Sequence, residues 1–309
     1  MTTPPRDASA PDPRDDRFRP PRRPDDWRAP GPAPAGSREA ALAVLGEGED
    51  ACHLLGDWRI FQKVGGHRWS LDDLVTAWLA VDMLARGALA APPRRALDLG
   101  TGIGSVLLML AWHLPEARLL GVEAQAVSAD LARRSVAWNG VGHRVSVREG
   151  DLREVAHGED AGSYALVTGT PPYWARGDGT ESGAVQKGPC RFEHRGGVED
   201  YCAAARRAVA DDGLVVLCHA ALQGDRLTDA AREAGLDVVR EVRVAGREGK
   251  PPLVVVAAFR PRLPGAEPPG GERAPAEVFA VRDRAGQWTP AFRALRATMG
   301  MPDRPPRRG

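Results

Sequence analysis

Short apolar runs alternate with amphipathic stretches between residues 95 and 260. Alternation of this kind is typical of repeated βα units around a mostly parallel sheet. The apolar runs predict strands at 95–99, 118–123, 144–148, 164–168, 213–218, 236–244 and 252–259. Amphipathic periodicity predicts helices at 104–113, 126–138, 198–210 and 223–234. The pattern therefore predicts an α/β fold with a doubly wound, seven-stranded sheet.

The turn chemistry at the end of this region adds a second feature. Only the short stretch AGREGKPP separates the last two predicted strands, so we expect them to form a C-terminal antiparallel hairpin. Further upstream, residues 38–48 and 71–86 have helical periodicity. Between them, DWRIFQKVGGHRW predicts a short hairpin with Gly65 and Gly66 at its turn. Apolar residues return at 276–300, which we expect to pack on the domain.

Proline marks the boundaries of these regions. Residues 1–36 hold 10 of the 27 prolines, and residues 261–309 hold 9. The first segment also has almost no branched aliphatic residues, and such a chain buries too little apolar area to offset its ordering entropy. We therefore predict a disordered Pro/Arg/Asp-rich tail at 1–36, a helical and hairpin segment at 37–94, the main domain at 95–260, and a Pro-rich linker with a C-terminal extension at 261–309.

Composition narrows the class of protein. The 42 basic and 41 acidic residues give a formal charge of +1, so any polyanion must be bound locally. The 4 cysteines include no C-x-x-C, and no histidine pairs with them at ligand spacing, so we expect neither a disulfide framework nor a metal. Since no signal-like or membrane-spanning apolar run is present, we expect a cytoplasmic protein without membrane contact. The oligomeric state stays open.

The best-marked site is the glycine turn in ALDLGTGIGSVLLML. Gly100, Gly102 and Gly104 let the backbone turn sharply and approach a ligand closely, and the following helix presents N–H groups at its start. In a dinucleotide fingerprint the third glycine sits one position later than Gly104 does, so this spacing disfavours NAD. We predict a cofactor site at this turn, Thr101 included.

Acidic residues at three successive strand ends indicate which cofactor it is. Asp98 precedes the glycines and favours a cationic ligand, because a carboxylate would repel a pyrophosphate. Glu123 ends the second strand, where a carboxylate can accept hydrogen bonds from both ribose hydroxyls, and Asp151 can accept from an adenine amine. S-adenosylmethionine has an ammonium and a sulfonium. Each acid alone also fits a helix cap, a turn cap or a solvated strand end.

The second candidate site is the turn Thr170-Pro171-Pro172-Tyr173 after the fourth strand. Two prolines fix the backbone, so their carbonyls are presented rigidly at the carboxyl edge of the sheet, beside the expected cofactor. Tyr173 offers a flat face to a planar substrate. We predict that this turn holds a planar substrate beside the cofactor.

These motifs resemble those of the class I S-adenosylmethionine-dependent amino-methyltransferases that carry Asn, Asp or Ser before Pro-Pro-Tyr. The chain is most similar to the bacterial tRNA1(Val) (adenine-37-N6)-methyltransferases, over about residues 57–260 and more faintly through GQWTPAF. The resemblance rests on FQKVGGHRWSLDDLVTAWLA, DLGTGIG, VEA, GDL, PPYW, CRFEHRGGVEDY and DDGLVVLCH. It implies the class I, Rossmann-like methyltransferase fold, S-adenosyl-L-methionine as cofactor, and tRNA or another structured RNA as partner.

The resemblance also implies roles for individual residues. The predicted cofactor-binding residues are Asp98, Gly100, Thr101, Gly102, Gly104, Glu123, Asp151 and Leu152. The predicted catalytic residues are Thr170, Pro171, Pro172 and Tyr173, and the predicted substrate-binding residues are Trp174, Arg68 and Arg191.

One position departs from the family's pattern. Thr170 stands where the family has Asn or Asp, whose side-chain oxygen accepts a hydrogen bond from the amine that is methylated. A hydroxyl also has lone pairs, but it is shorter and less basic than an amide carbonyl. The sequence therefore favours N-methylation of adenine in a structured RNA. Two alternatives stay open: methylation of a glutamine side chain, as by release-factor methyltransferases, and a module that binds the cofactor without catalysis.

Overall fold

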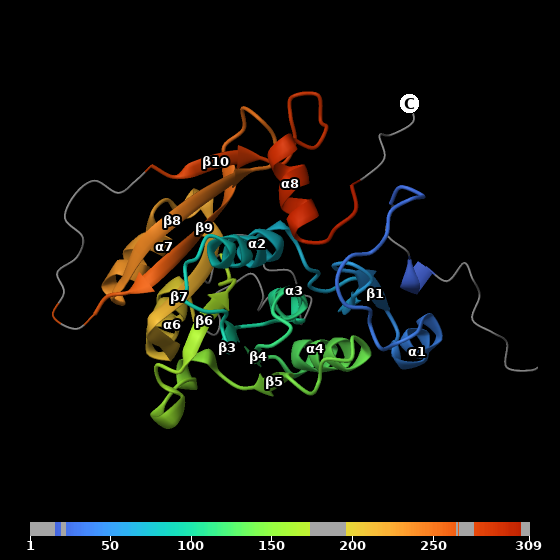
Figure 1. The fold of residues 1–309 in the computed structure, drawn as a ribbon, viewed down its shortest axis with the longest axis horizontal. Coiled ribbons are helices and arrows are strands. Elements are labelled where there is room, and N and C mark those ends of the chain that lie inside the picture. Colours follow the sequence, from blue (N-terminus) through green and yellow to red (C-terminus); the bar gives the residue numbers. More distant parts are fainter. Residues whose placement is uncertain (1–15, 20–22, 174–195, 264, 266–274, 304–309) are drawn as a thin grey trace, which may run out of the picture.

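The computed structural model describes residues 16–19, 23–173, 196–263, 265 and 275–303, and its centre is a mixed sheet (Figure 1). The sheet has 8 strands in the order β10-β8-β9-β7-β6-β3-β4-β5. Its strands are β3 (Arg95–Leu99), β4 (Arg118–Glu123), β5 (Val145–Glu149), β6 (Tyr164–Gly169), β7 (Val209–Ala220), β8 (Leu236–Ala245), β9 (Pro252–Pro261) and β10 (Glu277–Ala280). All neighbours are parallel except β9, which runs antiparallel to β7 and β8. The doubly wound sheet with a C-terminal hairpin is thus confirmed.

Helices cover both faces of this sheet. Figure 1 shows α2, α3 and α4 on one face and α6 and α7 on the other. The helices are α1 (Arg38–Val44), α2 (Leu71–Ala85), α3 (Ser105–His113), α4 (Ala126–Trp138), α6 (Val198–Ala208), α7 (Arg226–Glu233) and α8 (Pro290–Thr298). Short 3-10 turns lie at η1 (Asp16–Phe18), η2 (Leu152–Glu154), η3 (Gly158–Asp160) and η4 (Ala221–Gln223). No helix in the described ranges is long and apolar enough to cross a membrane.

Alternating strand residues build the core on the two faces. In β6, Leu166 packs in the cluster with α2 and α3, whereas its neighbour Val167 packs in the cluster with α6 and α7. Because both faces are covered, the inner strands are mostly apolar, as parallel strands between two helical layers are. In β3, β4 and β6 the polar side chains stand in the first position or in the last two.

The N-terminal hairpin differs from the predicted one. β1 (Glu49–His53) pairs with β2 (Arg59–Lys63), so the turn lies at residues 54–58 and the prediction of a turn at Gly65-Gly66 is wrong. The physical reason is burial: Ile60 and Phe61 are fully buried, and their strand finds its partner on the N-terminal side. The two glycines instead begin the connection to α2.

The C-terminal extension adds an eighth strand that the sequence pattern did not reveal. β10 pairs in parallel with β8, with Phe279 opposite Val244, and α8 places Phe292 and Leu295 in the core. Residues 276–300 therefore pack on the domain, as expected.

The described part of 1–36 also differs from the expected tail. The Gly36 N–H donates to the Trp138 carbonyl at 2.8 Å, and the Phe18 ring meets the Trp138 ring at 5.9 Å. These residues lie against α4 and cover the indole of Trp138, which is buried.

Asn139, at the end of α4, fastens the N-terminal hairpin to the domain. Its side-chain oxygen accepts from the Arg59 N–H at 3.2 Å, and its amide donates to the Arg59 and Ser135 carbonyls at 2.7 and 2.8 Å. The side chain is buried, so Asn139→Ala removes the partner of the Arg59 N–H and carbonyl without admitting water, whereas the Ser135 carbonyl still accepts from the backbone N–H of residue 139 at 3.0 Å. We expect the free energy of unfolding to fall by about 2 to 3 kcal/mol, measured by urea titration. No loss would contradict this role.

Candidate active site

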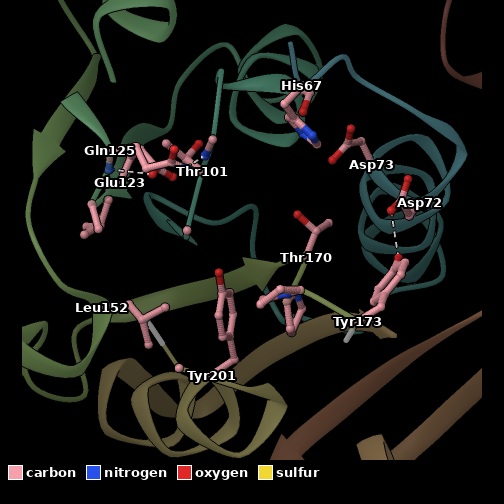
Figure 2. Close-up of a pocket in the computed structure, with 18 of the residues that line it drawn as sticks. His67, Asp72, Asp73, Thr101, Glu123, Gln125, Leu152, Thr170, Tyr173 and Tyr201 are labelled. Atoms are coloured by element: carbon pink, nitrogen blue, oxygen red, sulfur yellow. Dashed lines mark hydrogen bonds between the residues drawn. The ribbon is translucent and has the colours of Figure 1, made fainter. Parts of the chain in front are cut away.

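A cavity of about 620 Å³ opens at the carboxyl edge of the sheet, beside the start of α2. Figure 2 shows Glu123, Gln125 and Leu152 on one side of it, His67, Asp72, Asp73 and Tyr173 on the other, and Thr170 and Tyr201 between. The predicted site residues that line it are Arg68, Gly100, Thr101, Gly102, Glu123, Asp151, Leu152, Thr170, Pro171, Pro172 and Tyr173. Asp98 and Gly104 are not among the lining residues. Trp174 and Arg191 lie outside the described residues.

The glycine turn needs glycine for its backbone conformation. Gly100, Gly102 and Gly104 have φ angles of 58°, 57° and 87°, in the left-handed region that other residues rarely adopt. Gly104 has a second reason, because a Cβ there would lie 3.1 Å from the Cβ of Ala132 on α4. It therefore serves the packing of α3 against α4, while the first two glycines border the cavity.

Glu123 holds the glycine turn from the end of β4. One carboxylate oxygen accepts from the Gly102 N–H at 2.9 Å, and the other accepts from the Gln125 N–H at 2.7 Å. The side chain is buried, yet it borders the cavity.

Asp98 is buried beside the turn. Its carboxylate accepts from the hydroxyls of Thr101 at 2.6 Å and Thr168 at 2.8 Å, so it links the glycine turn to the neighbouring strand β6. Burial raises the pKa of Asp98 to about 6, although both hydroxyls oppose the shift. Its direct contact with a cofactor stays a prediction.

The raised pKa of Asp98 predicts a pH dependence of stability. Between pH 3.8 and about 6 the folded chain holds a proton that the unfolded chain releases, so this group's contribution to stability falls as the pH rises. Asp98→Asn removes the titration. We expect the variant to gain about 2 kcal/mol relative to the parent protein between pH 4 and 7, measured by urea unfolding. A difference that is the same at both pH values would contradict the assignment.

Asp151 and Leu152 follow β5. The Asp151 carboxylate caps the η2 turn by accepting from the Arg153 N–H at 2.9 Å, and it forms an ion pair with the Arg153 side chain at 2.5 Å. Leu152 is buried and borders the same side of the cavity. Asp151 therefore caps the η2 turn and also lines the cavity.

The start of α2 forms the opposite wall. Ser70 and Asp73 make a capping box, in which the Ser70 N–H donates to the Asp73 carboxylate at 3.0 Å. Burial, followed by the nearby charge of Asp72, raises the pKa of Asp73 well above its ordinary value. A carboxyl in this setting favours the protonated form unless a cation lies next to it.

Tyr173 joins this wall to the doubled-proline turn. Its hydroxyl donates to the Asp72 carboxylate at 2.8 Å and lies 3.4 Å from the Cys218 sulfur. The Gln223 side-chain amide donates to the Tyr173 carbonyl at 3.0 Å. The tyrosine is therefore held from two sides, and the ring is positioned where the turn meets the cavity.

Several lining residues were not predicted as site residues. They are Gly66, His67, Ser70, Ser105, Val122, Ala124, Gln125, Gly150, Gly196 and Tyr201. Ser70 and Asp73 carry a capping-box signal in the sequence, S-x-x-D, that marks the start of a helix near the site. Tyr201 carries no local signal, because its place depends on how α6 packs.

The electrostatics of the cavity favour a cationic ligand. Carboxyl groups stand on both sides, with Glu123 and Asp151 on one and Asp72 and Asp73 on the other; Asp151 is ion-paired with Arg153, and the raised pKa of Asp73 favours its neutral form until a cation lies beside it. Arg68 also borders the cavity, but it is ion-paired with Asp50 at 2.8 Å. Among the described residues, no group of three or more His, Cys, Asp or Glu side chains is arranged to hold a metal ion.

Comparisons with known proteins agree with this geometry. A protein-family model described as a methyltransferase domain matches residues 96–175. A release factor glutamine methyltransferase of Bordetella pertussis is 30% identical over 219 residues, 65% of this chain and 76% of that protein. A tRNA1(Val) (adenine(37)-N6)-methyltransferase of Erwinia tasmaniensis is 27% identical over 170 residues, 55% of this chain and 68% of that protein.

A further relative and a solved structure show how far the similarity extends. A release factor glutamine methyltransferase of Xylella fastidiosa is 34% identical over 134 residues, 40% of this chain, and the chain spans about half (46%) of that relative's length. The crystal structure of a predicted O-methyltransferase from Agrobacterium tumefaciens superposes with a TM-score of 0.51 at 18% identity, over 75% of this chain and 98% of that chain. The structural likeness supports the fold alone.

Proposed function

Because this chain belongs to the class I S-adenosylmethionine-dependent methyltransferases, we propose that it methylates the exocyclic amine of adenine in tRNA or another structured RNA. The observation that carries the proposal is that the glycine turn and the turn from Thr170 to Tyr173 border one cavity. In this proposal the methyl donor and the acceptor nitrogen meet in that cavity. We propose the cytoplasm as the compartment, because the proposed substrate, tRNA, is found there.

The residues of the cavity fit the donor. Glu123 would accept from the ribose hydroxyls, and Asp151 and Leu152, which line the cavity, would hold the adenine ring. Asp72 and Asp73 place carboxyl groups on the other side, where the ammonium group of the donor's amino acid portion gains from them. When bound, S-adenosylmethionine supplies an electrophilic methyl group on a sulfonium.

The chain's own contribution is to position the acceptor. In this proposal the Thr170 hydroxyl and the Pro171 carbonyl accept hydrogen bonds from the amine, which directs its lone pair toward the donor. Tyr173, held by Asp72, offers a flat face to the base. Orientation of this kind supplies about 7 to 11 kcal/mol of the barrier reduction in well-aligned reactions.

A second candidate acceptor is the side-chain amide of a protein glutamine. It is favoured by the release factor glutamine methyltransferases among the relatives, one of them at 30% identity. A planar amide presents the same kind of nitrogen as adenine does, so the doubled-proline turn suits both. We place RNA first because the resemblance to the tRNA enzymes includes the segment from Phe61 to Ala80, which supplies the Asp72 wall.

Labelled donor distinguishes the two acceptors. The purified protein is incubated with methyl-labelled S-adenosylmethionine and either protein-free tRNA or an RNA-free protein fraction. We expect label in RNA, recovered as N6-methyladenosine by mass spectrometry of digested nucleosides. Label in protein alone would overturn the RNA proposal and favour glutamine. Nucleosides of tRNA and rRNA from a deletion strain locate the modified position.

A further inference from the structure

Tyr201 stands at the centre of the cavity without a role in the proposed function. It lies one turn into α6, whose start is fixed by the Gly197 N–H, which donates to the Asp200 carboxylate at 3.1 Å. The side chain is 94% buried, since its exposed fraction is 6%. Figure 2 shows its hydroxyl pointing from the floor into the cavity, between Leu152 and Thr170.

Two glycines make room for this one ring. A Cβ at Gly100 would lie 1.9 Å from the Tyr201 hydroxyl oxygen, and a Cβ at Gly169 would lie 2.8 Å from ring atom Cδ1. Gly100 also needs its left-handed backbone, but Gly169 is not among the glycines with positive φ. At Gly169 the missing side chain is therefore explained by space, which the Tyr201 ring and the Leu217 side chain fill.

The register of the sheet makes these two glycines neighbours. β3 and β6 pair with Leu99 opposite Gly169, and Gly100 follows Leu99 directly. The ring therefore lies across two adjacent strand ends, with the glycine turn on one and the doubled-proline turn on the other. Its hydroxyl is brought to the point where the donor site and the acceptor site meet.

We propose that Tyr201 is a cofactor-contacting residue, whose hydroxyl forms a hydrogen bond with bound S-adenosylmethionine over the junction of β3 and β6. An aliphatic side chain would fill the same space between the strand ends, but it would bring no polar group to the cavity. A tyrosine suits such a place because its body is apolar and its tip is polar. The inference uses the cofactor of the family and does not depend on which acceptor is methylated.

The test is the affinity for S-adenosylmethionine of Tyr201→Phe, measured by calorimetry without any acceptor. This variant keeps the ring on the two glycines and removes only the hydroxyl. We expect the dissociation constant to rise about 3- to 10-fold, the loss that one hydrogen bond represents. The melting temperature without ligand should stay within about 2 °C of the parent, since the packing is kept.

Tyr164→Phe is the matched control. Tyr164 is also buried, but it lies at the other end of β6 and does not line the cavity. We therefore expect the loss of its hydroxyl to leave the dissociation constant for S-adenosylmethionine unchanged. Gly169→Ala would displace the Tyr201 ring and should also weaken binding. The double variant Gly169→Ala/Tyr201→Phe should lose less affinity than the sum of the two single losses, because both substitutions remove the same contact.

Two results would overturn the proposal. One is an unchanged dissociation constant in a folded Tyr201→Phe. The other is a loss of affinity that Tyr164→Phe shares, or that accompanies a fall in melting temperature, because the hydroxyl would then be structural. Either result leaves the RNA proposal standing, since no acceptor is present in the measurement.

Discussion

Glu123→Ala is expected to weaken the binding of S-adenosylmethionine by about 10²- to 10³-fold. The substitution removes the carboxylate that holds the Gly102 and Gln125 N–H groups and that borders the donor site. Hydrogen bonds to charged groups contribute about 1.5 to 3 kcal/mol each. The variant loses the expected ribose contact and leaves two N–H groups of the turn unpaired. Together these losses account for an affinity that is weaker by about 10²- to 10³-fold.

Calorimetry with Glu149→Ala as control isolates the effect of Glu123. Glu149 stands directly opposite Glu123 in the β4–β5 register, but it is exposed and does not border the cavity. Both variants lose one negative charge at the same edge of the sheet. Similar affinities of the two variants would mean that Glu123 acts only through net charge, and the assigned contact would be wrong.

Local sequence signals were sufficient for the central part of this fold. The runs of β3, β4 and β6 are apolar because both faces of the sheet are covered, and their lengths mark strands without further information. Gly100 and Gly102 were predictable as well, since a sharp turn between strand and helix requires left-handed backbone.

Signals that depend on distant partners were not visible in the chain. The turn of the N-terminal hairpin was misplaced because a Gly-Gly pair is a strong local signal, whereas the actual partner of β2 is chosen by burial of Ile60 and Phe61. β10 was missed because four residues after a Pro-rich segment show too little periodicity. Its pairing with β8 follows from the fold.

In the candidate site, too, local sequence signals predicted some residues, whereas contacts between distant residues were not predictable. Glu123 could be placed at the cavity from the strand that it ends, but no sequence pattern places Asp72 against Tyr173, which is 101 residues away. Asp98 illustrates the intermediate case. Its position before the glycines was informative, yet the two threonine hydroxyls that surround its carboxylate come from separate segments.

Thr170→Ala is expected to lower the rate of methyl transfer to RNA by about 10²- to 10³-fold, while donor affinity stays unchanged. Thr170 borders the cavity between the two walls, and in Figure 2 its side chain points into the open space. It is the only residue of the Thr-Pro-Pro segment with a polar side chain. Loss of one preorganised partner of a reacting group costs about 2.7 to 4 kcal/mol in other enzymes.

The matched variants separate the hydroxyl from the shape of the side chain. Thr170→Ser keeps the acceptor and should retain most of the single-turnover rate. Thr170→Asn provides a longer and more basic carbonyl, so its rate should equal or exceed that of the parent. If Thr170→Ala is as fast as Thr170→Ser, the side chain takes no part in transfer. The acceptor would then be oriented by the carbonyls of the doubled-proline turn alone, because their direction is fixed by the two rings and does not depend on the preceding side chain.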